Sequence, residues 1–215
     1  MNTTADVKAE CHITCTSSNA AQVVEAVAKE WDTDTVILVP DQYLAKNVAA
    51  QTDIRIITWP GACEVHELFS SDDVEALREA HPGVVILAHP ECPPDVLESA
   101  DFAGSTAALA NYVKDESPAK VVLLTECSMS DNVAAENPGV DFVRPCNLCP
   151  HMKQITLENI LECLTEMRHE VTIEESVRVK AKAAIDAMLA LPKMESPLAF
   201  ETGLAPMEIE VISPS

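Results

Sequence analysis

The sequence predicts an α/β fold built from two similar three-layer domains, and three features of its 215 residues support this prediction. Helical and strand patterns alternate along the chain. The strand candidates are runs of Val, Ile and Leu, typical of parallel strands that helices cover on both faces. A set of landmarks also occurs twice in the same order. Such folds bind ligands at the carboxyl ends of their strands, so the turns that follow the strands are candidate sites.

The repeat is clearest in a five-residue match. Residues 47–51 (NVAAQ) recur as residues 132–136 (NVAAE), 85 positions later. Alone, such a match in an alanine-rich chain is compatible with coincidence. A serine-containing turn at 16–17 also recurs at 104–105, and further landmarks keep their order around both matches. We therefore interpret the chain as two copies of one α/β unit.

Each copy is expected to contain a short helix, a strand, the serine turn, a helix, an apolar strand, a second helix and a last strand. In the first copy the pattern predicts a helix over 19–30 and a strand over 35–39. A strong strand over 84–88 introduces the second copy, followed by a helix over 106–114 and a strand over 121–125. The first copy has no counterpart of strand 84–88, because the chain begins there. We therefore expect that an earlier segment is missing.

The sequence changes character after Pro145. Apolar periodicity predicts amphipathic helices over 155–168 and 174–191, which we expect to cover the second domain, with Thr156 as an N-cap. The last 24 residues contain four prolines and no sustained periodicity, which predicts an extended or partly disordered tail. The expected domains are 1–80, 81–191 and the tail 192–215.

Charge and composition exclude several classes of partner. The chain has 14 Lys and Arg against 35 Asp and Glu, and its net charge of -21 disfavours nucleic acid and anionic lipid. No apolar run approaches the roughly 20 residues that span a membrane, and residues 1–20 do not resemble a secretory signal. We expect a soluble cytoplasmic protein. An ordinary acidic surface and adaptation to a high-salt cytosol both explain the charge.

Cysteines end both repeats and are candidate metal ligands. Eight cysteines in a reducing compartment are expected to be thiols or ligands, not a disulfide framework. Cys63 ends the first copy, and a shift of 85 positions lands beside Cys149, which is therefore preferred over Cys146. Equivalent thiolates of symmetric repeats converge on one axis, as ligands of an iron-sulfur cluster must. The spacing of Cys146 and Cys149 also fits a redox pair or half a zinc site. The other cysteines are expected to be small buried residues: Cys11, Cys15, Cys92, Cys127 and Cys163.

Polar residues follow strand 84–88 directly. The segment His89-Pro90-Glu91 should lie at the carboxyl end of this strand, where an imidazole and a carboxylate can handle protons. A capped strand end with surface polar residues is about as common for an isolated segment of this kind. The position at a strand terminus favours function.

Hydroxyl residues open the helices that follow both serine turns. Ser17, Ser105 and Thr106 stand where hydroxyls and unpaired backbone N–H groups bind carboxylate or phosphate. Single residues of this kind are most often plain N-caps, whereas two in matching repeats indicate an anionic substrate. His66 follows Cys63 by three residues, and a structural role is the commoner one for such a histidine.

At these residues the sequence resembles quinolinate synthase, the iron-sulfur enzyme family of de novo NAD biosynthesis. The similarity extends from Asn2 to about Leu191. The segments that carry it are 2–5, 7–9, 16–20, 40–41 with Leu44, 61–63 with 65–66, 89–91, 104–106, and Cys149 with 152–153 and 155–157.

The resemblance implies three similar α/β domains around a pseudo-threefold axis, of which the first is absent here. One cysteine from each domain holds a central 4Fe-4S cluster, and Cys63 and Cys149 match the second and third ligands. It also implies condensation of iminoaspartate with dihydroxyacetone phosphate to quinolinate. The matching substrate-binding positions are Asn2, Ser17, His89, Pro90, Glu91, Ser105 and Thr106, among which His89 and Glu91 are the expected catalytic residues.

Two other hypotheses fit the sequence. One is a noncatalytic α/β binding module stabilised by zinc at Cys146, Cys149 and His151. The other is a fragment that does not fold alone. Iron or zinc bound per chain distinguishes the enzyme from the zinc module.

Overall fold

The structure is a computed structural model that describes residues 3–145, 147–192, 199–200, 202, 207 and 209–212. The chain forms two compact units. The sheet unit contains Cys15–Asn147 and the residues from Pro192 onward, and the helical unit contains the residues up to Thr14 together with Leu148–Leu191. These units are defined by contacts, whereas the boundaries at 80 and 191 follow the sequence repeat and stay predictions.

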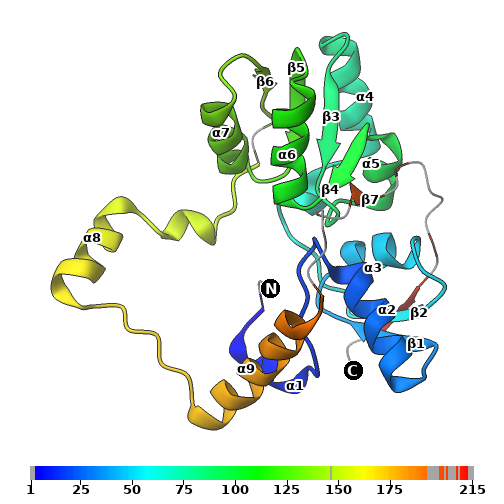
Figure 1. Cartoon of the computed structure of the whole chain (residues 1–215). Coiled ribbons are helices and arrows are strands. Elements are labelled where there is room, and N and C mark those ends of the chain that lie inside the picture. Colours follow the sequence, from blue (N-terminus) through cyan, green and yellow to red (C-terminus); the bar gives the residue numbers. More distant parts are fainter. Residues whose placement is uncertain are drawn as a thin grey trace. The chain divides into compact units, whose positions relative to one another are not determined.

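The first sheet of the sheet unit has three parallel strands in the order β1-β2-β8. They are β1 (Thr35–Leu38), β2 (Arg55–Thr58) and β8 (Glu210–Val211). Helix α2 (Ala20–Trp31) precedes β1, and α3 (Gln42–Ala49) connects β1 to β2 (Figure 1). The β-branched sequences TVIL and RIIT favour extended backbone, and Leu38 and Ile56 bury their side chains in the core.

The second sheet has five strands in the order β6-β5-β3-β4-β7, all parallel except β7. They are β3 (Val85–Ala88), β4 (Phe102–Gly104), β5 (Lys120–Leu124), β6 (Asp141–Val143) and β7 (Ala199–Phe200). The helices of this part are α4 (Ser71–Ala80), α5 (Pro94–Ser99), α6 (Thr106–Glu116) and α7 (Cys127–Glu136). They lie on both faces of the sheet (Figure 1), so the predicted α/β fold is confirmed.

One hydrophobic cluster joins the two sheets inside the sheet unit. It contains Ile56 of the first sheet together with Ile86 and Leu124 of the second. A second cluster lies around Leu109 and Leu123. Because both sheets share the larger cluster, they form one packed body.

The element order follows the predicted repeat. In the first copy α2-β1-α3-β2 succeed one another, and in the second copy α6-β5-α7-β6 do so. The strand expected before the first serine turn is not formed. Its backbone has another partner, because the Thr14 N–H donates to the Ala184 carbonyl at 3.1 Å.

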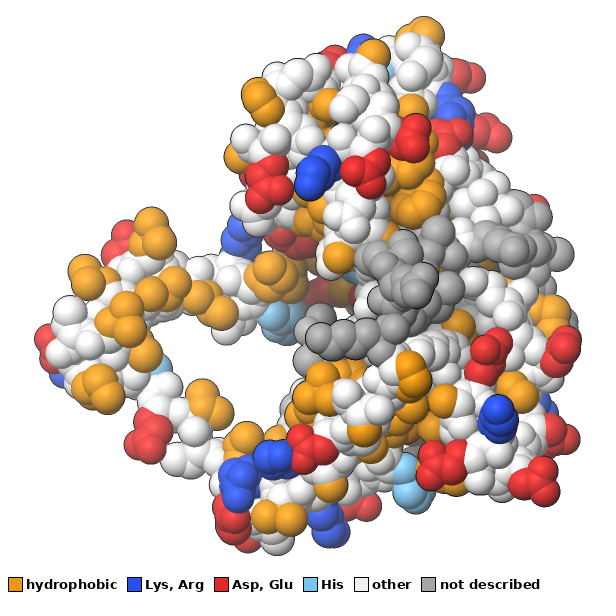
Figure 2. Space-filling view, in the orientation of Figure 1, with side chains coloured by type: hydrophobic (Ala, Val, Ile, Leu, Met, Phe, Trp, Pro, Cys, Tyr) orange, Lys and Arg blue, Asp and Glu red, His pale blue; other side chains and the backbone are white. Residues whose placement is uncertain are grey.

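In the helical unit, α1 (Ala5–Glu10) packs against α9 (Glu175–Ala190). Helix α9 buries Ala184 and Met188 within this unit, and the prediction that helix 174–191 covers the second domain stays a prediction. Helix α8 (Leu157–Glu166) begins at the predicted cap, with Thr156 and Asn159 in a capping box. None of its residues is buried, and apolar side chains run along it (Figure 2).

The tail was expected to be extended or partly disordered, and its described part contains β7 and β8. Phe200 is buried in the larger core cluster, and its neighbour in β4 is Ala103. These edge pairings give the short segments their strand structure. Among the described residues no helix has the length and apolarity to cross a membrane.

Candidate active site

Two adjacent strands of the second sheet end at the candidate site. His89, Pro90 and Glu91 follow β3, and Thr125 follows β5. These strands are parallel neighbours, with Ala88 opposite Leu124, so the residues after them lie together. The His89 N–H donates to the Leu124 carbonyl at 3.3 Å. His89 and Glu91 thus occupy the carboxyl end of a strand, as the sequence predicts.

The loop after β2 carries Cys63. Its course is fixed by Asp41, whose Oδ2 accepts a hydrogen bond from the Cys63 N–H at 2.9 Å. The loop also passes close to the backbone at Pro40, because a Cβ on Gly61 would lie 2.6 Å from the Pro40 oxygen. Only glycine fits this approach without a shift, and the backbone leading to Cys63 is therefore held by Asp41 and packed closely against Pro40.

His66 occupies the centre of the site. It begins the short 3-10 helix η1 (His66–Leu68), and its side chain is buried. Nδ1 lies 3.1 Å from Glu91 Oε2, and Nε2 lies 3.0 Å from Thr125 Oγ1. The ring stacks on His89 with centroids 4.4 Å apart and an interplanar angle of 11°. The closest partner of Glu91 is thus His66, since His89 Nδ1 lies 3.8 Å from the same oxygen.

Burial and hydrogen bonding set the charges of this group. Burial acts to lower the pKa of His66, but hydrogen bonds to Cys63 and Glu91 and the charges of these two residues raise it to about 9. Burial acts to raise the pKa values of Cys63 and Glu91, yet both lie below their ordinary values because His66 stabilises the ionised forms. Cys63, whose pKa is lowered, and the Glu91 carboxylate therefore flank an imidazolium.

The pKa of His89 is shifted in the opposite direction to that of His66. Burial, with the nearby charge of His66, lowers its pKa to about 3, so the ring is neutral. The Glu91 N–H donates to Nδ1 at 3.3 Å, which assigns the proton of the neutral ring to Nε2. His89 is therefore a hydrogen-bond donor through Nε2 at neutral pH.

The donor set also has the chemistry of a metal site. Ligand atoms of Cys63, His66 and Glu91 all lie within 4.8 Å of one another. Thiolate, imidazole and carboxylate are ligands that zinc and iron accept. For an iron-sulfur cluster the relevant donor is the sulfur of Cys63, and its lowered pKa, its irregular loop and its anchored amide fit that role.

The other predicted residues are spread over the chain. Ser105 is buried and its Oγ caps α6 by accepting from the Ala108 N–H at 3.3 Å, whereas Thr106 is exposed. Ser17 lies half-buried in the turn before α2. Cys149 and His151 belong to the helical unit, so the convergence of Cys149 with Cys63 stays a prediction. Asn2 and Cys146 lie outside the described residues.

The remaining cysteines follow the predictions only in part. Cys92 and Cys127 are buried as expected, whereas Cys11, Cys15 and Cys163 are partly exposed. Cys127 is disulfide-bonded, so the prediction of a thiol is wrong at this position. Its backbone N–H donates to the Asn147 carbonyl at 3.1 Å, and the chain around residue 147 therefore lies against the start of α7.

Three supporting residues were not predicted from the sequence. Asp41 anchors Cys63, and Thr125 contacts His66. Asn47 is buried in α3 and donates from Nδ2 to the carbonyls of Pro90 at 2.8 Å and Cys92 at 3.0 Å, which holds the turn after β3. Asn47 opens the repeated NVAA motif, and that repetition was the available signal.

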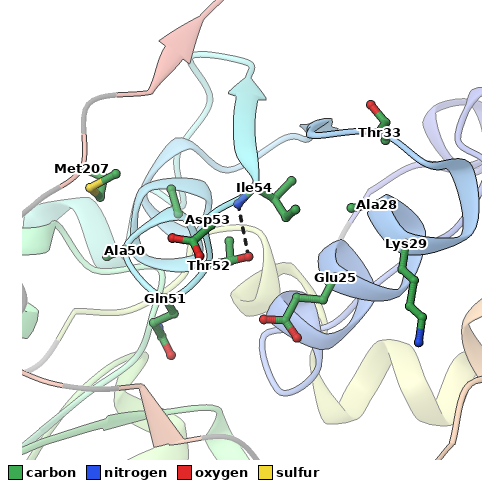
Figure 3. Close-up of a pocket in the computed structure, with 11 residues that line it drawn as sticks. Glu25, Ala28, Lys29, Thr33, Ala50, Gln51, Thr52, Asp53, Ile54 and Met207 are labelled. Carbon is green, nitrogen blue, oxygen red and sulfur yellow. Dashed lines mark hydrogen bonds between the residues drawn. The ribbon is translucent and has the colours of Figure 1, made fainter.

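A separate cavity of about 760 Å³ lies in the sheet unit. Figure 3 shows Glu25 and Lys29 of α2 on one side and the segment from Ala50 to Ile54 after α3 on the other. None of the described residues that line it is a predicted site residue. The cavity is thus distinct from the group around His66.

Comparison with known proteins identifies the family of the chain. A family model described as "Quinolinate synthetase A protein" matches residues 1–190. The quinolinate synthase of Caulobacter vibrioides (strain NA1000 / CB15N) is 54% identical over 211 residues, which are 98% of this chain and 58% of that protein. Quinolinate synthase of Agrobacterium fabrum is 58% identical over 191 residues, covering 89% of this chain and 54% of that protein. Quinolinate synthase 1 of Mesorhizobium japonicum is 60% identical over 189 residues, covering 88% of this chain and 57% of that protein.

The chain spans little more than half the length of these relatives. The match nevertheless includes both sheet-forming repeats, the Cys63 loop and the segment from His89 to Glu91. With the family model matching most of its length, the chain belongs to the quinolinate synthase family.

Proposed function

We propose that the chain acts as part of a quinolinate synthase, which condenses iminoaspartate with dihydroxyacetone phosphate to quinolinate and releases phosphate and water. The observation that carries this proposal is the meeting of Glu91, His66 and His89 beside the Cys63 loop in a chain of this family. Proton-handling groups and a metal-binding thiolate at one place suit a condensation with dehydrations.

The proposed cofactor is a 4Fe-4S cluster, with Cys63 and Cys149 as two of its ligands. The ionisable, anchored thiol of Cys63 supports this role. When bound, a cluster with three thiolate ligands supplies an iron atom that acts as a Lewis acid on a substrate oxygen or nitrogen. The third thiolate belongs to the first domain that the family resemblance implies.

The chain's own residues supply binding and proton transfer. Glu91 is ionised and can accept a proton from a substrate carbon or hydroxyl, while the neutral ring of His89 donates a hydrogen bond from Nε2. The amino terminus of α6, with Ser105 and Thr106, suits a carboxylate or phosphate. Asn2, Ser17 and Pro90 complete the proposed substrate contacts.

Metal analysis tests the cofactor. The chain is purified without oxygen, reconstituted with iron and sulfide, and its absorption and its iron per chain are measured. Cys63→Ala and Cys149→Ala should each lower the iron content, whereas Cys163→Ala, a partly exposed thiol, should leave it unchanged. A chain that binds stoichiometric zinc and no iron would support the zinc-stabilised module instead.

Turnover tests the reaction. Quinolinate formation is measured for the reconstituted chain alone and with the part of the Caulobacter relative that the chain does not match. Activity that depends on Glu91, and that is lost in Glu91→Gln with the cluster absorption retained, supports the assignment. No quinolinate from either mixture, with a full complement of cluster, contradicts it.

A further inference from the structure

We propose that His66 is a positioning residue that holds the Glu91 carboxylate in its working orientation and links it to the loop of Cys63. This inference rests on the proposed function, because it takes Glu91 as the group that exchanges protons with substrate. It adds a residue whose role the sequence does not indicate.

Three contacts hold the ring of His66. One nitrogen lies 3.1 Å from Glu91 Oε2, the other lies 3.0 Å from Thr125 Oγ1, and one face stacks on His89. A ring held at both ends and on one face cannot turn without breaking a contact. Its side chain is only 8% exposed, so water does not replace these partners easily.

His66 and its two hydrogen-bond partners come from different parts of the fold. His66 itself follows the loop of Cys63, and the Glu67 N–H donates to the Cys63 carbonyl at 2.9 Å across the turn. Glu91 follows β3 and Thr125 follows β5. His66 is therefore the side chain through which the cysteine loop of the first sheet contacts the strand ends of the second.

The two histidine contacts of Glu91 are made to the same carboxylate oxygen. Both His66 and His89 approach Oε2, at 3.1 and 3.8 Å. Within the described part of the chain, neither Lys nor Arg forms an ion pair with Glu91. Both histidine contacts are therefore made to Oε2, and the closer one places His66 as the group that orients the carboxylate.

Two substitutions of His66 by amide residues distinguish the contact of Nδ1 with Glu91 from the contact of Nε2 with Thr125. Asparagine places its amide near the position of Nδ1, so His66→Asn keeps a donor for Glu91 and loses the Thr125 contact. Glutamine places its amide near Nε2, so His66→Gln keeps the Thr125 contact and loses the donor to Glu91. Thr125→Val removes the hydroxyl at nearly constant shape.

The expected result is an ordered series of kcat values in the reconstituted protein used for the turnover test. His66→Gln should lose about 10- to 100-fold in kcat, the range typical of residues that orient a catalytic group, with KM changed less than about twofold. His66→Asn should recover most of that loss. Cluster absorption should stay at the wild-type level in all variants, and His81→Asn, at the end of α4, should behave as wild type.

Equal losses in His66→Asn and His66→Gln, or a loss that appears only with loss of cluster absorption, overturn the positioning role. A second readout does not depend on turnover. The ring-nitrogen NMR signals of His66 in the ¹⁵N-histidine-labelled chain should shift in Glu91→Gln and in Thr125→Val. If the wild-type protein makes no quinolinate while these shifts occur, the proposed reaction fails and the hydrogen-bonded link stands. Unshifted signals overturn the link itself.

Discussion

Asp41 joins the start of helix α3 to the backbone of Cys63. Its Oδ1 accepts from the Leu44 N–H at 2.7 Å, which caps the helix, and its Oδ2 accepts from the Cys63 N–H at 2.9 Å. One carboxylate therefore fixes both a helix end and a candidate metal ligand. Charge-assisted bonds of this kind are stronger than neutral ones.

We expect Asp41→Asn to loosen the Cys63 loop. An amide group has one acceptor oxygen, so it cannot accept from both N–H groups with separate atoms. Loss of one such bond and part of the cap should lower the free energy of unfolding by about 1–2 kcal/mol. Denaturant unfolding measures the loss, and the rate of Cys63 alkylation should rise. Asp115→Asn at an exposed site of α6 is the control, and an equal effect there would refute the anchoring role.

Asn47→Ala should destabilise the turn that carries His89 and Glu91. The change leaves the buried carbonyls of Pro90 and Cys92 without their Asn47 donor, which costs roughly 2 kcal/mol in the free energy of unfolding. Thermal unfolding and kcat are the measurements.

The repeat supplies a matched control for Asn47. Asn132 opens the second NVAA motif but is exposed, so Asn132→Ala should change stability by less than about 0.5 kcal/mol. If the two variants lose the same stability, the hydrogen bonds of Asn47 do not hold the turn.

Gly61→Ala should displace the loop of Cys63. The added methyl group would meet the Pro40 carbonyl oxygen at 2.6 Å, and backbone atoms cannot move aside as a flexible side chain can. We expect a cost of about 1–3 kcal/mol and reduced iron binding after reconstitution. A Cβ on Gly139 would meet nothing within 4 Å, so Gly139→Ala should leave iron binding unchanged. Normal iron content in Gly61→Ala would show that the loop tolerates the shift.

Much of the fold was predictable because its signals are local. Runs of Val, Ile and Leu marked β1, β3 and β5, and Thr156 marked the start of α8. Strands β7 and β8 have two residues each and depend on the edges of β4 and β2, which no local pattern reveals. The tail therefore looked irregular from its sequence.

The candidate site likewise contains residues that local sequence signals predict and residues that depend on contacts between distant parts of the chain. Cys63, His89 and Glu91 were predicted as candidate residues from their positions in the repeat and at a strand end. Thr125 was not, because its contact with His66 joins residues 59 positions apart in the chain. Asn47 reaches Pro90 across 43 positions. A histidine near a cysteine is commonly structural, and the contacts that support the proposed role of His66 are visible only in the packing.

The buried, neutral His89 should make the sheet unit sensitive to acid. Its folded pKa of about 3 lies below the ordinary value of 6.5, so between these pH values the unfolded chain binds a proton that the native state does not. Stability should therefore fall as pH decreases from 6.5 toward 3, by at most roughly 1.4 kcal/mol per pH unit for one proton. His89→Gln removes this titration, and denaturant unfolding at successive pH values should show a shallower slope.

Asp41 has the opposite effect on stability over part of this pH range, because its protonation favours the folded state. Burial raises its pKa from 3.8 to about 6, so the native state takes up this proton first as pH falls, and protonation favours folding between those values. Asp41→Asn should therefore steepen the loss of stability between pH 6 and 4, whereas His89→Gln should reduce it. Measured together, the two variants separate the contributions. The same slope in both variants and the wild type would mean that neither buried group controls the acid response.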